Sequence, residues 1–311
     1  MPLDIDAFQS WVGRAEAAED VAAPGPLAGL ASLLDHATPP WIPGELPPLA
    51  HWLYFVPRER QSLLDRDGHL KRGEFLPPVP LPRRMWAGSR VRFLAPIPIG
   101  TAMRRRSTIA SVSAKSGRSG PMVFVTIRHE INLGSTTAII EEQDIVFRAA
   151  ALPADSGERS PPRAAVPESS TLPETATLPE SSTLPETATF PRKRASPNAT
   201  RTVVPDPLLL FRFSALTFNA HRIHYDRDYA RQVEGYAGLV VHGPLIATLL
   251  MDHFLRLCGA PAVRAFSFRA ERPLFDTAPF ELRLAQNGSG AQLWATDSAG
   301  AVAVSATVAC E

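Results

Sequence analysis

The chain of 311 residues has only two cysteines, Cys258 and Cys310. Two cysteines cannot build the disulfide framework of a small secreted domain and suit a reducing compartment, so we expect a cytoplasmic protein. The formal net charge is only +1, which excludes nucleic-acid binding driven by overall basicity. The sequence also lacks a basic start followed by an apolar run, and it lacks any apolar stretch long enough to cross a bilayer. It therefore predicts neither a secretory signal nor a membrane helix.

Aromatic residues and strand patterns become scarce between residues 151 and 200, where prolines are frequent. Four six-residue repeats follow one another here, beginning at Pro167, Pro173, Pro179 and Pro185. Proline at this period, combined with Ser, Thr and Glu, cannot form a packed core, so we predict an extended, disordered linker. A docking tract for a partner is the alternative. The predicted organisation is a first domain at 1–150, the linker at 151–200 and a second domain at 201–311.

Segments rich in Val, Ile, Phe and Thr predict four strands in each half. We expect them at residues 89–93, 103–113, 122–132 and 138–147, and again at 263–269, 280–285, 291–296 and 301–309. Amphipathic patterns predict helices at 7–18 and 27–34, and short aromatic runs predict strands at 51–55 and 211–216. A largely apolar helix is predicted from Pro244 to Cys258, and other structure must surround it.

The two halves share a short internal match. Residues 93–102 and 268–278 both run Phe-x-Ala-x-x-Pro-aliphatic into Thr-Ala, one insertion apart. In each half the match leads into further predicted strands. We therefore expect two copies of a unit made of a helix and an antiparallel sheet, which is an α+β protein.

Titratable side chains gather just before the apolar helix. His221 and His224 follow Asn219 in a polar turn, and histidine is the side chain most easily poised for proton transfer near neutral pH. One of the two could act as a general base, or both could be hydrogen-bonded loop residues. No third ligand lies at motif spacing from this pair, so we predict no metal site.

The start of the apolar helix offers hydrogen-bond donors. Pro244 suits the first position of a helix, and the free backbone N–H groups at Gly243, Leu245 and Ile246 could stabilise a developing oxyanion. The alternative is that Gly243 only permits a tight turn.

Two stretches of this region, FSALTFNAHRIHYD at 213–226 and EGYAGLVVHGPL at 234–245, resemble the MaoC-like hydratases and dehydratases. They are most similar to the branch that contains mesaconyl-C4-CoA and itaconyl-CoA hydratases and a mitochondrial-type hydroxyacyl-thioester dehydratase. Residues 73–88 carry the resemblance into the first half. It implies a double hot-dog fold, with two antiparallel sheets each wrapped around a helix, a degenerate first half that shapes a substrate groove and a catalytic second half.

The resemblance also implies the catalytic residues. In the resemblance, Asn219 occupies the position of the family's usual aspartate, and His224 occupies the position of its histidine. The backbone amide of Gly243 would donate to the thioester oxygen. The asparagine is a departure from the general pattern, because an amide orients water but cannot take up a proton. His224 must then carry more of the acid–base chemistry.

The activity implied is reversible hydration of an α,β-unsaturated acyl-CoA, with no cofactor beyond the coenzyme A thioester of the substrate and with a homodimer as a further expectation. A dicarboxylic acyl group calls for an arginine. The predicted substrate-binding residues are Arg83, Arg84, Arg222, Tyr225 and His242. The alternatives are a 3-hydroxyacyl-thioester dehydratase of fatty-acid synthesis, which needs an apolar tunnel, and a noncatalytic double hot-dog that binds acyl-CoA.

Overall fold

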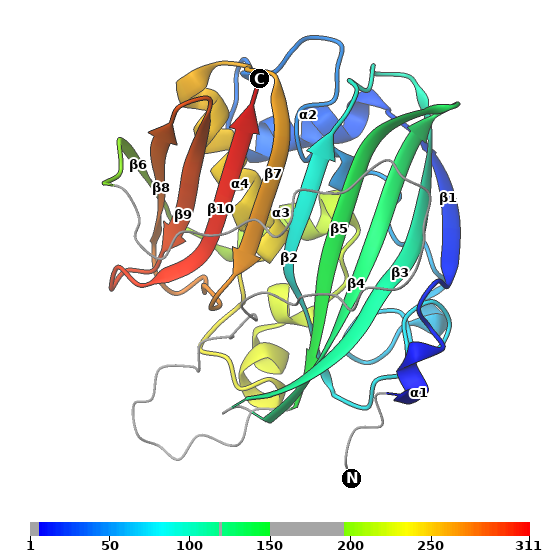
Figure 1. Cartoon of the computed structure of the whole chain (residues 1–311). Coiled ribbons are helices and arrows are strands. Elements are labelled where there is room, and N and C mark those ends of the chain that lie inside the picture. The colour runs from blue at the N-terminus through cyan, green and yellow to red at the C-terminus, as the bar shows by residue number, and fades with distance from the viewer. Residues whose placement is uncertain (1–5, 118–119, 150–195) are drawn as a thin grey trace.

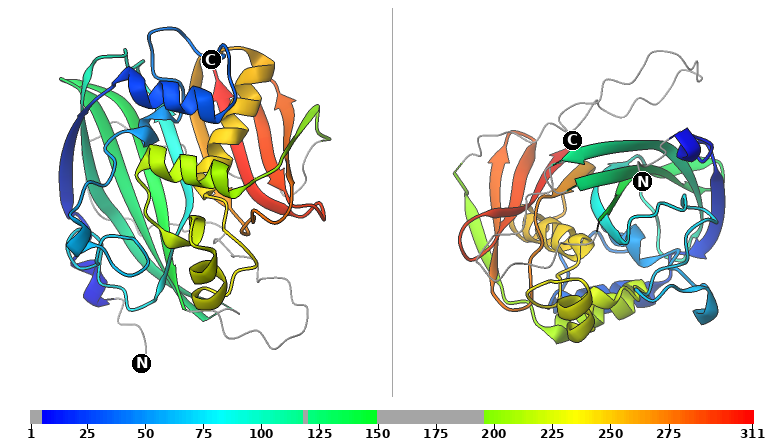
Figure 2. Two further views of the ribbon diagram at one scale, coloured as in Figure 1. Left: turned by 180° about the vertical axis from the view of Figure 1, so that it is seen from behind. Right: turned by 90° about the horizontal axis from the view of Figure 1, so that it is seen from below.

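The computed structural model describes residues 6–117, 120–149 and 196–311. Ten antiparallel strands form one continuous curved sheet, and the longer helices lie against one face of it (Figure 1 and Figure 2). Residues 151–195, which make up most of the predicted linker, lie outside the described residues. None of the described helices has the length and apolar character needed to cross a membrane.

Five strands come from each half of the chain. Those of the first half are β1 (Ala15–Val21), β2 (Arg83–Phe93), β3 (Ala102–Gly117), β4 (Gly120–Leu133) and β5 (Thr136–Arg148). Those of the second half are β6 (Ala199–Val203), β7 (Val263–Ala270), β8 (Phe280–Asn287), β9 (Gly290–Thr296) and β10 (Val302–Cys310). All eight strands predicted at 89–147 and 263–309 are present, and the edge strands β1 and β6 were not predicted as strands.

The strand order shows that the two halves repeat one topology. From the centre outward, the first half runs β2, β5, β4, β3, β1 and the second half runs β7, β10, β9, β8, β6. The central strands β2 and β7 pair with each other antiparallel, for example Arg90 with Ser267. The segments that share the internal sequence match extend from the ends of these two strands. The arrangement is the predicted double hot-dog, with its two sheets joined edge to edge.

Gly88 permits the close approach of the two halves at this seam. A Cβ atom at position 88 would lie 2.4 Å from the carbonyl oxygen of Phe268 in β7. We expect Gly88→Ala to lower the free energy of unfolding by about 2–3 kcal/mol, because backbone atoms would have to move. Urea denaturation measures this, with Gly25→Ala as the control because a Cβ there meets nothing within 4 Å. Equal stability of the two variants would contradict the prediction.

The helices are α1 (Asp6–Gln9), α2 (Pro24–Leu33), α3 (Pro207–Thr217) and α4 (Gly243–Cys258). Single turns are η1 (Ala50–Leu53), η2 (Gln61–Leu63), η3 (Arg222–His224) and the π-helical η4 (Tyr229–Val233). Helix α4 is the predicted apolar helix, and it packs against β8, β9, β10 and β2. Its buried carboxylate, Asp252, is neutralised by Arg201 at 2.6 Å and Arg256 at 2.9 Å, so the helix is held on its polar face as well.

Three predicted elements need correction. Residues 211–216 belong to helix α3, because Asp206 accepts a hydrogen bond from the Leu209 amide and Pro207 occupies the first turn. Residues 51–55 form the turn η1 and its exit, because Leu49 has a left-handed φ of 70° that ends any extended run. The predicted helix at 7–18 stops at Gln9, and Gly13 with φ of 85° turns the chain into β1.

The first half has no counterpart of α4 among the described residues. Helix α2 is short and lies beside α3 and η1 at one end of the sheet. The view from below shows the two halves of the sheet curving toward the side that carries the helices (Figure 2). Side chains on the strands of the first half, among them Arg105, Ile127 and Glu141, line a cavity instead of packing on a central helix.

Candidate active site

A cavity of about 700 Å³ lies where the two halves meet. Its volume falls in the range of about 300–1,000 Å³ that is usual for small-molecule sites. Both halves contribute to its wall, with Trp52 and Trp86 from the first half and Phe213 and Val241 from the second. The predicted residues Asn219, His224, Gly243 and Arg84 all line this one cavity.

Asn219 reaches the cavity from the C-terminal end of α3. Phe218 adopts a left-handed φ of 50°, and the Asn219 amide donates to the carbonyl of Ser214 at 2.8 Å, so the chain turns inward. The side-chain oxygen of Asn219 accepts a hydrogen bond from the His221 amide at 3.0 Å. Because that bond fixes the orientation of the amide, the Asn219 NH₂ group is left to donate into the cavity.

His224 is held with one ring nitrogen available for chemistry. Its Nδ1 donates to the carbonyl of Val240 at 2.7 Å, which leaves Nε2 as the unprotonated nitrogen of the neutral ring. The Val240 amide in turn donates to the carbonyl of Ile223 at 3.0 Å, so this segment and η3 hold each other. Burial lowers the pKa of His224 to about 4, although the Val240 carbonyl opposes that shift. His224 is therefore an uncharged potential base near neutral pH.

His242 supports His224 and does not line the cavity. The two rings stack with centroids 3.6 Å apart, and His242 is fully buried. Its Nε2 is hydrogen-bonded with the hydroxyl of Ser214 at 2.9 Å. Burial, and then repulsion from His224 and His221, hold the pKa of His242 well below its ordinary value. His242 was predicted to bind substrate, and the structure places it behind the ring of His224, away from the cavity lining.

Gly243 and Pro244 bring the start of α4 to the cavity wall. The backbone amide of Gly243 has no hydrogen-bond acceptor among the described residues. The amide of Ile246 donates to the carbonyl oxygen of His242 at 3.0 Å. Leu245 is fully buried and does not line the cavity. Of the three predicted donors, Gly243 alone therefore faces the space in which a ligand could lie.

The predicted arginines are separated by the structure. Arg84 lines the cavity and has no ion-pair partner among the described residues. Burial, partly opposed by the charge of Asp67, lowers its pKa to about 10, so the guanidinium stays charged near neutral pH. Arg83, on the other face of β2, is paired with Glu234 at 2.9 Å and lies over the ring of Tyr236. Of the three predicted arginines, Arg84 is therefore the one that is available to an anion in the cavity.

Arg222 and Tyr225 lie outside this cavity. Arg222 pairs with Asp226 at 2.7 Å, stacks over Tyr229 and lines a separate hollow. Tyr225 is 48% exposed, and its hydroxyl donates to the carbonyl of Ala220. Both side chains hold the turn together, and the structure does not bring either of them to the cavity where Asn219, His224, Gly243 and Arg84 meet.

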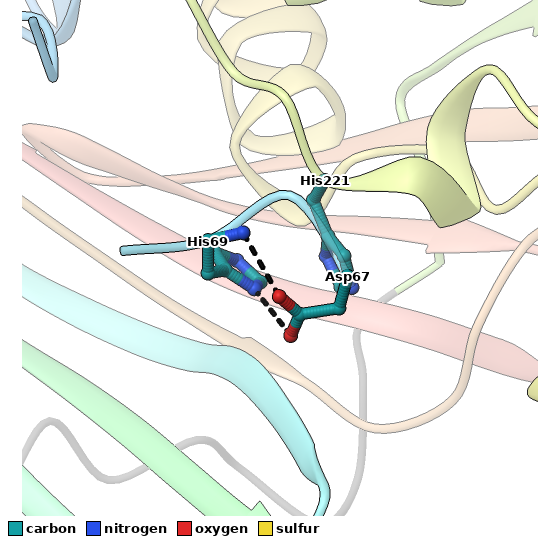
Figure 3. A group of neighbouring side chains, drawn as sticks. All are labelled: Asp67, His69 and His221. Atoms are coloured by element: carbon teal, nitrogen blue, oxygen red, sulfur yellow. Dashed lines mark hydrogen bonds and ion pairs between the residues drawn. The ribbon is translucent and has the colours of Figure 1, made fainter. Parts of the chain in front are cut away.

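The sequence analysis missed Asp67 and His69, which belong to a turn of the first half. Figure 3 shows them beside His221, with two hydrogen bonds joining the carboxylate to His69. The sequence signal that could have found them is an aspartate two residues before a histidine, at an Asp-Gly turn. The ligand atoms of the three side chains lie within 4.8 Å of one another, a spacing that a metal ion could use. The carboxylate of Asp67 is already engaged by His69, however, and the positive charge of Arg84 lies near enough to lower the pKa of His69.

The buried histidines predict how stability depends on pH. His224 has a folded pKa of about 4 against an ordinary value of 6.5, so below pH 6.5 the unfolded chain takes up a proton that the folded chain refuses. The contribution of His224 to the free energy of unfolding is complete above pH 6.5 and falls as the pH drops toward 4. Lowering the pH from about 6.5 to about 5 should therefore reduce the free energy of unfolding by about 2 kcal/mol. Urea denaturation of the wild type and of His224→Gln at both pH values tests this, and an equal loss in the two proteins would contradict it.

The sequence matches the family model described as hydroxyacyl-thioester dehydratase type 2, over residues 49–184 and 170–276. It is 47% identical over 304 residues to mesaconyl-C(4)-CoA hydratase of Chloroflexus aurantiacus, covering 97% of each chain. It is also 26% identical over 253 residues to the mitochondrial hydroxyacyl-thioester dehydratase type 2 of Schizosaccharomyces pombe, covering 80% of each.

Solved structures share the fold. A MaoC-like dehydratase from Phytophthora capsici superposes with a TM-score of 0.66 at 13% identity, covering 99% of this chain and 98% of that one. A conserved hypothetical protein of Mycobacterium tuberculosis, described as having a double hot-dog fold, superposes with a TM-score of 0.56 at 16% identity, covering 96% and 95%. At these identities the superpositions establish the double hot-dog architecture alone.

Proposed function

Because this chain belongs to the hydroxyacyl-thioester dehydratase type 2 family, we propose that it is a hydro-lyase that hydrates a branched dicarboxylic enoyl-CoA, mesaconyl-C4-CoA or itaconyl-CoA, to citramalyl-CoA. The 47% identity to a mesaconyl-C(4)-CoA hydratase across almost the whole chain supports this substrate class. The observation that carries the proposal is the convergence of His224, Gly243 and the unpaired Arg84 on one cavity. The two free cysteines, Cys258 and Cys310, suit action in the cytoplasm.

Hydration begins at the thioester. Addition of water to the β-carbon pushes electrons toward the thioester oxygen, which becomes enolate-like. The Gly243 amide, at the positive end of α4, donates to that oxygen and stabilises the developing negative charge. The coenzyme A group arrives with the substrate, so the proposed chemistry uses only groups of this chain and of the substrate.

The water is activated at the turn beside α3. Nε2 of His224 accepts a proton from the water as the oxygen bonds to the β-carbon. The NH₂ group of Asn219 donates to the water oxygen and orients it, or in the reverse direction to the departing hydroxyl. Asn219 itself cannot take up the proton, and this is why the chemistry depends on imidazole.

Arg84 explains a preference for a dicarboxylic substrate. In a mesaconyl group esterified at C4, the free carboxylate is attached to the carbon that water attacks, so its counterion must lie beside the histidines. Arg84 meets this requirement, because its charge is close enough to lower the pKa of both His69 and His221. A two-pronged guanidinium–carboxylate contact would orient the acyl group as well as bind it.

The test is to incubate the enzyme with mesaconyl-C4-CoA, itaconyl-CoA, crotonyl-CoA and a medium-chain enoyl-CoA, and to follow the hydroxyacyl thioesters by chromatography. We expect the dicarboxylic thioesters to be hydrated fastest. Preference for the longer chain would instead support the dehydratase of fatty-acid synthesis. Binding of all four without turnover would indicate a noncatalytic acyl-CoA-binding protein.

A further inference from the structure

A turn of the first half is docked against the catalytic turn of the second. Gly68 has a φ of 92°, and a Cβ atom there would lie 1.8 Å from the carbonyl oxygen of Ala220. The backbone amide of Arg222 donates to the carbonyl of Asp67 at 2.9 Å. These contacts put the side chains that flank Gly68 beside the histidines of the site, although more than 150 residues separate the two turns in the chain.

Asp67 and His69 form a carboxylate–imidazole pair within that turn. One carboxylate oxygen accepts the backbone amide of His69 at 2.9 Å, and the other accepts Nδ1 of the ring at 3.0 Å (Figure 3). With its proton on Nδ1, the neutral ring keeps a lone pair on Nε2. The side chain of His69 is 21% exposed and lines the cavity, so this nitrogen belongs to a group that a ligand can approach.

His69 is the first of four imidazoles in contact. Its ring centroid lies 4.1 Å from that of His221, which is 5.3 Å from that of His224, which stacks on His242 at 3.6 Å. Two adjacent imidazolium ions repel each other strongly when buried, so this row holds one proton far more readily than two. Among these four rings, His69 alone is hydrogen-bonded to a carboxylate within the described residues.

Burial, and then the charge of Arg84, lower the pKa of His69 to about 4. Asp67 offsets part of this shift by favouring the protonated ring, whereas Arg72 adds to it. His69 and His224 therefore have similar pKa values, so a proton can be shared between them. Hydrogen bonds from His69 outweigh burial and keep the pKa of Asp67 below its ordinary value, so the carboxylate is ionised. Arg72 is itself held by the carbonyls of Val79 and Leu81 and is not free to neutralise Asp67.

We propose that Asp67 and His69 are the second acid–base pair of the active site, contributed by the first half of the chain, and that His69 holds the proton of the reacting water. The inference rests on the proposed hydratase function. It answers a need of that mechanism: the position that carries an aspartate in the general MaoC-like pattern is Asn219, which supplies no charge. Asp67 supplies the missing carboxylate from the other side of the cavity.

The proton balance of the step closes within the site. As the water oxygen bonds to the β-carbon, its O–H bond breaks, the proton goes to Nε2 of His224, and the π electrons move to the thioester oxygen. The proton then passes along the row of imidazoles, by way of the intervening His221, to Nε2 of His69, where the ionised Asp67 stabilises the imidazolium. When the enolate collapses, His69 gives the proton to the α-carbon, and both rings return to their neutral starting state.

The experiment is the pH dependence of kcat and KM for Asp67→Asn, in which the charge is gone and the one amide oxygen can replace only one of the two hydrogen bonds that the carboxylate accepts from His69. We expect kcat to fall about 10²-fold with little change in KM, within the range of general acid–base effects. The acid limb of the kcat/KM profile should move about one unit to lower pH, because loss of an adjacent carboxylate lowers an imidazole pKa by that order. The kcat of His69→Gln should fall by a similar factor. The kcat of the double variant, Asp67→Asn with His69→Gln, should be no lower than that of His69→Gln alone.

Asp65→Asn is the matched control. Asp65 lies in the same turn, and it is exposed. Among the described residues, its carboxylate accepts a hydrogen bond only from the backbone amide of Arg66. A purely structural role for Asp67 would leave the acid limb in place, and wild-type kcat in Asp67→Asn would overturn the proposal. Loss of activity on dialysis against a chelator, with recovery on adding Zn²⁺, would also overturn it, by making these residues metal ligands.

A second readout separates this proposal from the function on which it rests. NMR of the ¹⁵N-labelled histidine rings in the full chain should show the His69 titration moving to lower pH in Asp67→Asn and staying in place in Asp65→Asn. If the wild type hydrates no thioester, the proposed function fails while this titration still reports on the pair. An unmoved His69 titration together with active wild type would reject the pair alone.

Discussion

Replacing His224 by glutamine should lower kcat by about 10³-fold while the protein remains folded, a loss within the range for a general base. The glutamine amide can donate to the carbonyl of Val240 as Nδ1 of His224 does, so the turn keeps its hydrogen bond. It has no nitrogen that accepts a proton near neutral pH. The variant should therefore still bind the acyl-CoA, with Kd close to that of the wild type by calorimetry.

The control for His224→Gln is His253→Gln. His253 is also buried, at 4% exposure, but it lies on α4 outside the cavity lining. Its replacement should change stability and leave kcat within a few-fold. A His224→Gln enzyme whose kcat stays within about tenfold of the wild type would remove His224 from the role of base, since such a loss is below the usual range.

Replacing Arg84 by methionine should change which thioester is preferred. Methionine fills much of the same space without charge, so a substrate carboxylate would be buried with no counterion. We expect kcat/KM for mesaconyl-C4-CoA to fall by about two to three powers of ten, corresponding to about 3–4 kcal/mol for breaking a buried ion pair. Hydration of crotonyl-CoA, which has no free carboxylate, should be unchanged or faster.

Two matched variants test whether the effect belongs to Arg84. Arg83→Met removes a guanidinium that is already paired with Glu234, and Arg222→Met removes one that is paired with Asp226. Neither should change the ratio of kcat/KM between the two thioesters. An Arg84→Met enzyme that loses the same factor on both substrates would show that Arg84 maintains the cavity without recognising the carboxylate.

These predictions depend on a site that is shared between two distant parts of the chain. Asn219, His224 and Gly243 lie close in sequence and are recognised from one motif. Arg84 and His69 come from the first half and reach the same cavity by different routes. Arg84 lies on β2, which pairs with β7 at the centre of the sheet, and His69 lies in a turn that docks against Ala220 and Arg222. The first half, predicted to shape the groove and to supply substrate-binding arginines but no catalytic base, therefore also brings the imidazole of His69 to the cavity.

Local sequence signals were reliable where the hydrophobic pattern and the turn chemistry agreed. The eight strands were predicted from their content of β-branched and aromatic residues, and the helix α4 from its nearly all-apolar sequence after Pro244. The segment 211–216 was mistaken for a strand because its aromatic residues were weighed more heavily than the start signal Asp206-Pro207. In α3, Leu210, Phe213 and Ser214 are buried while Phe211 is 61% exposed, a spacing that belongs to a helix.

The sequence by itself determined the family, the two-fold repeat of the fold and the residues His224, Asn219 and Gly243, because each depends on residues that are near one another in the chain. Only the tertiary structure decided which of the predicted arginines lines the cavity, since neighbouring residues of a strand point to opposite faces and Arg83 forms an ion pair with Glu234. It also decided that Asp67 and His69 join the site. That contact depends on a left-handed glycine packing against a carbonyl from the other half of the chain, and no local pattern encodes it.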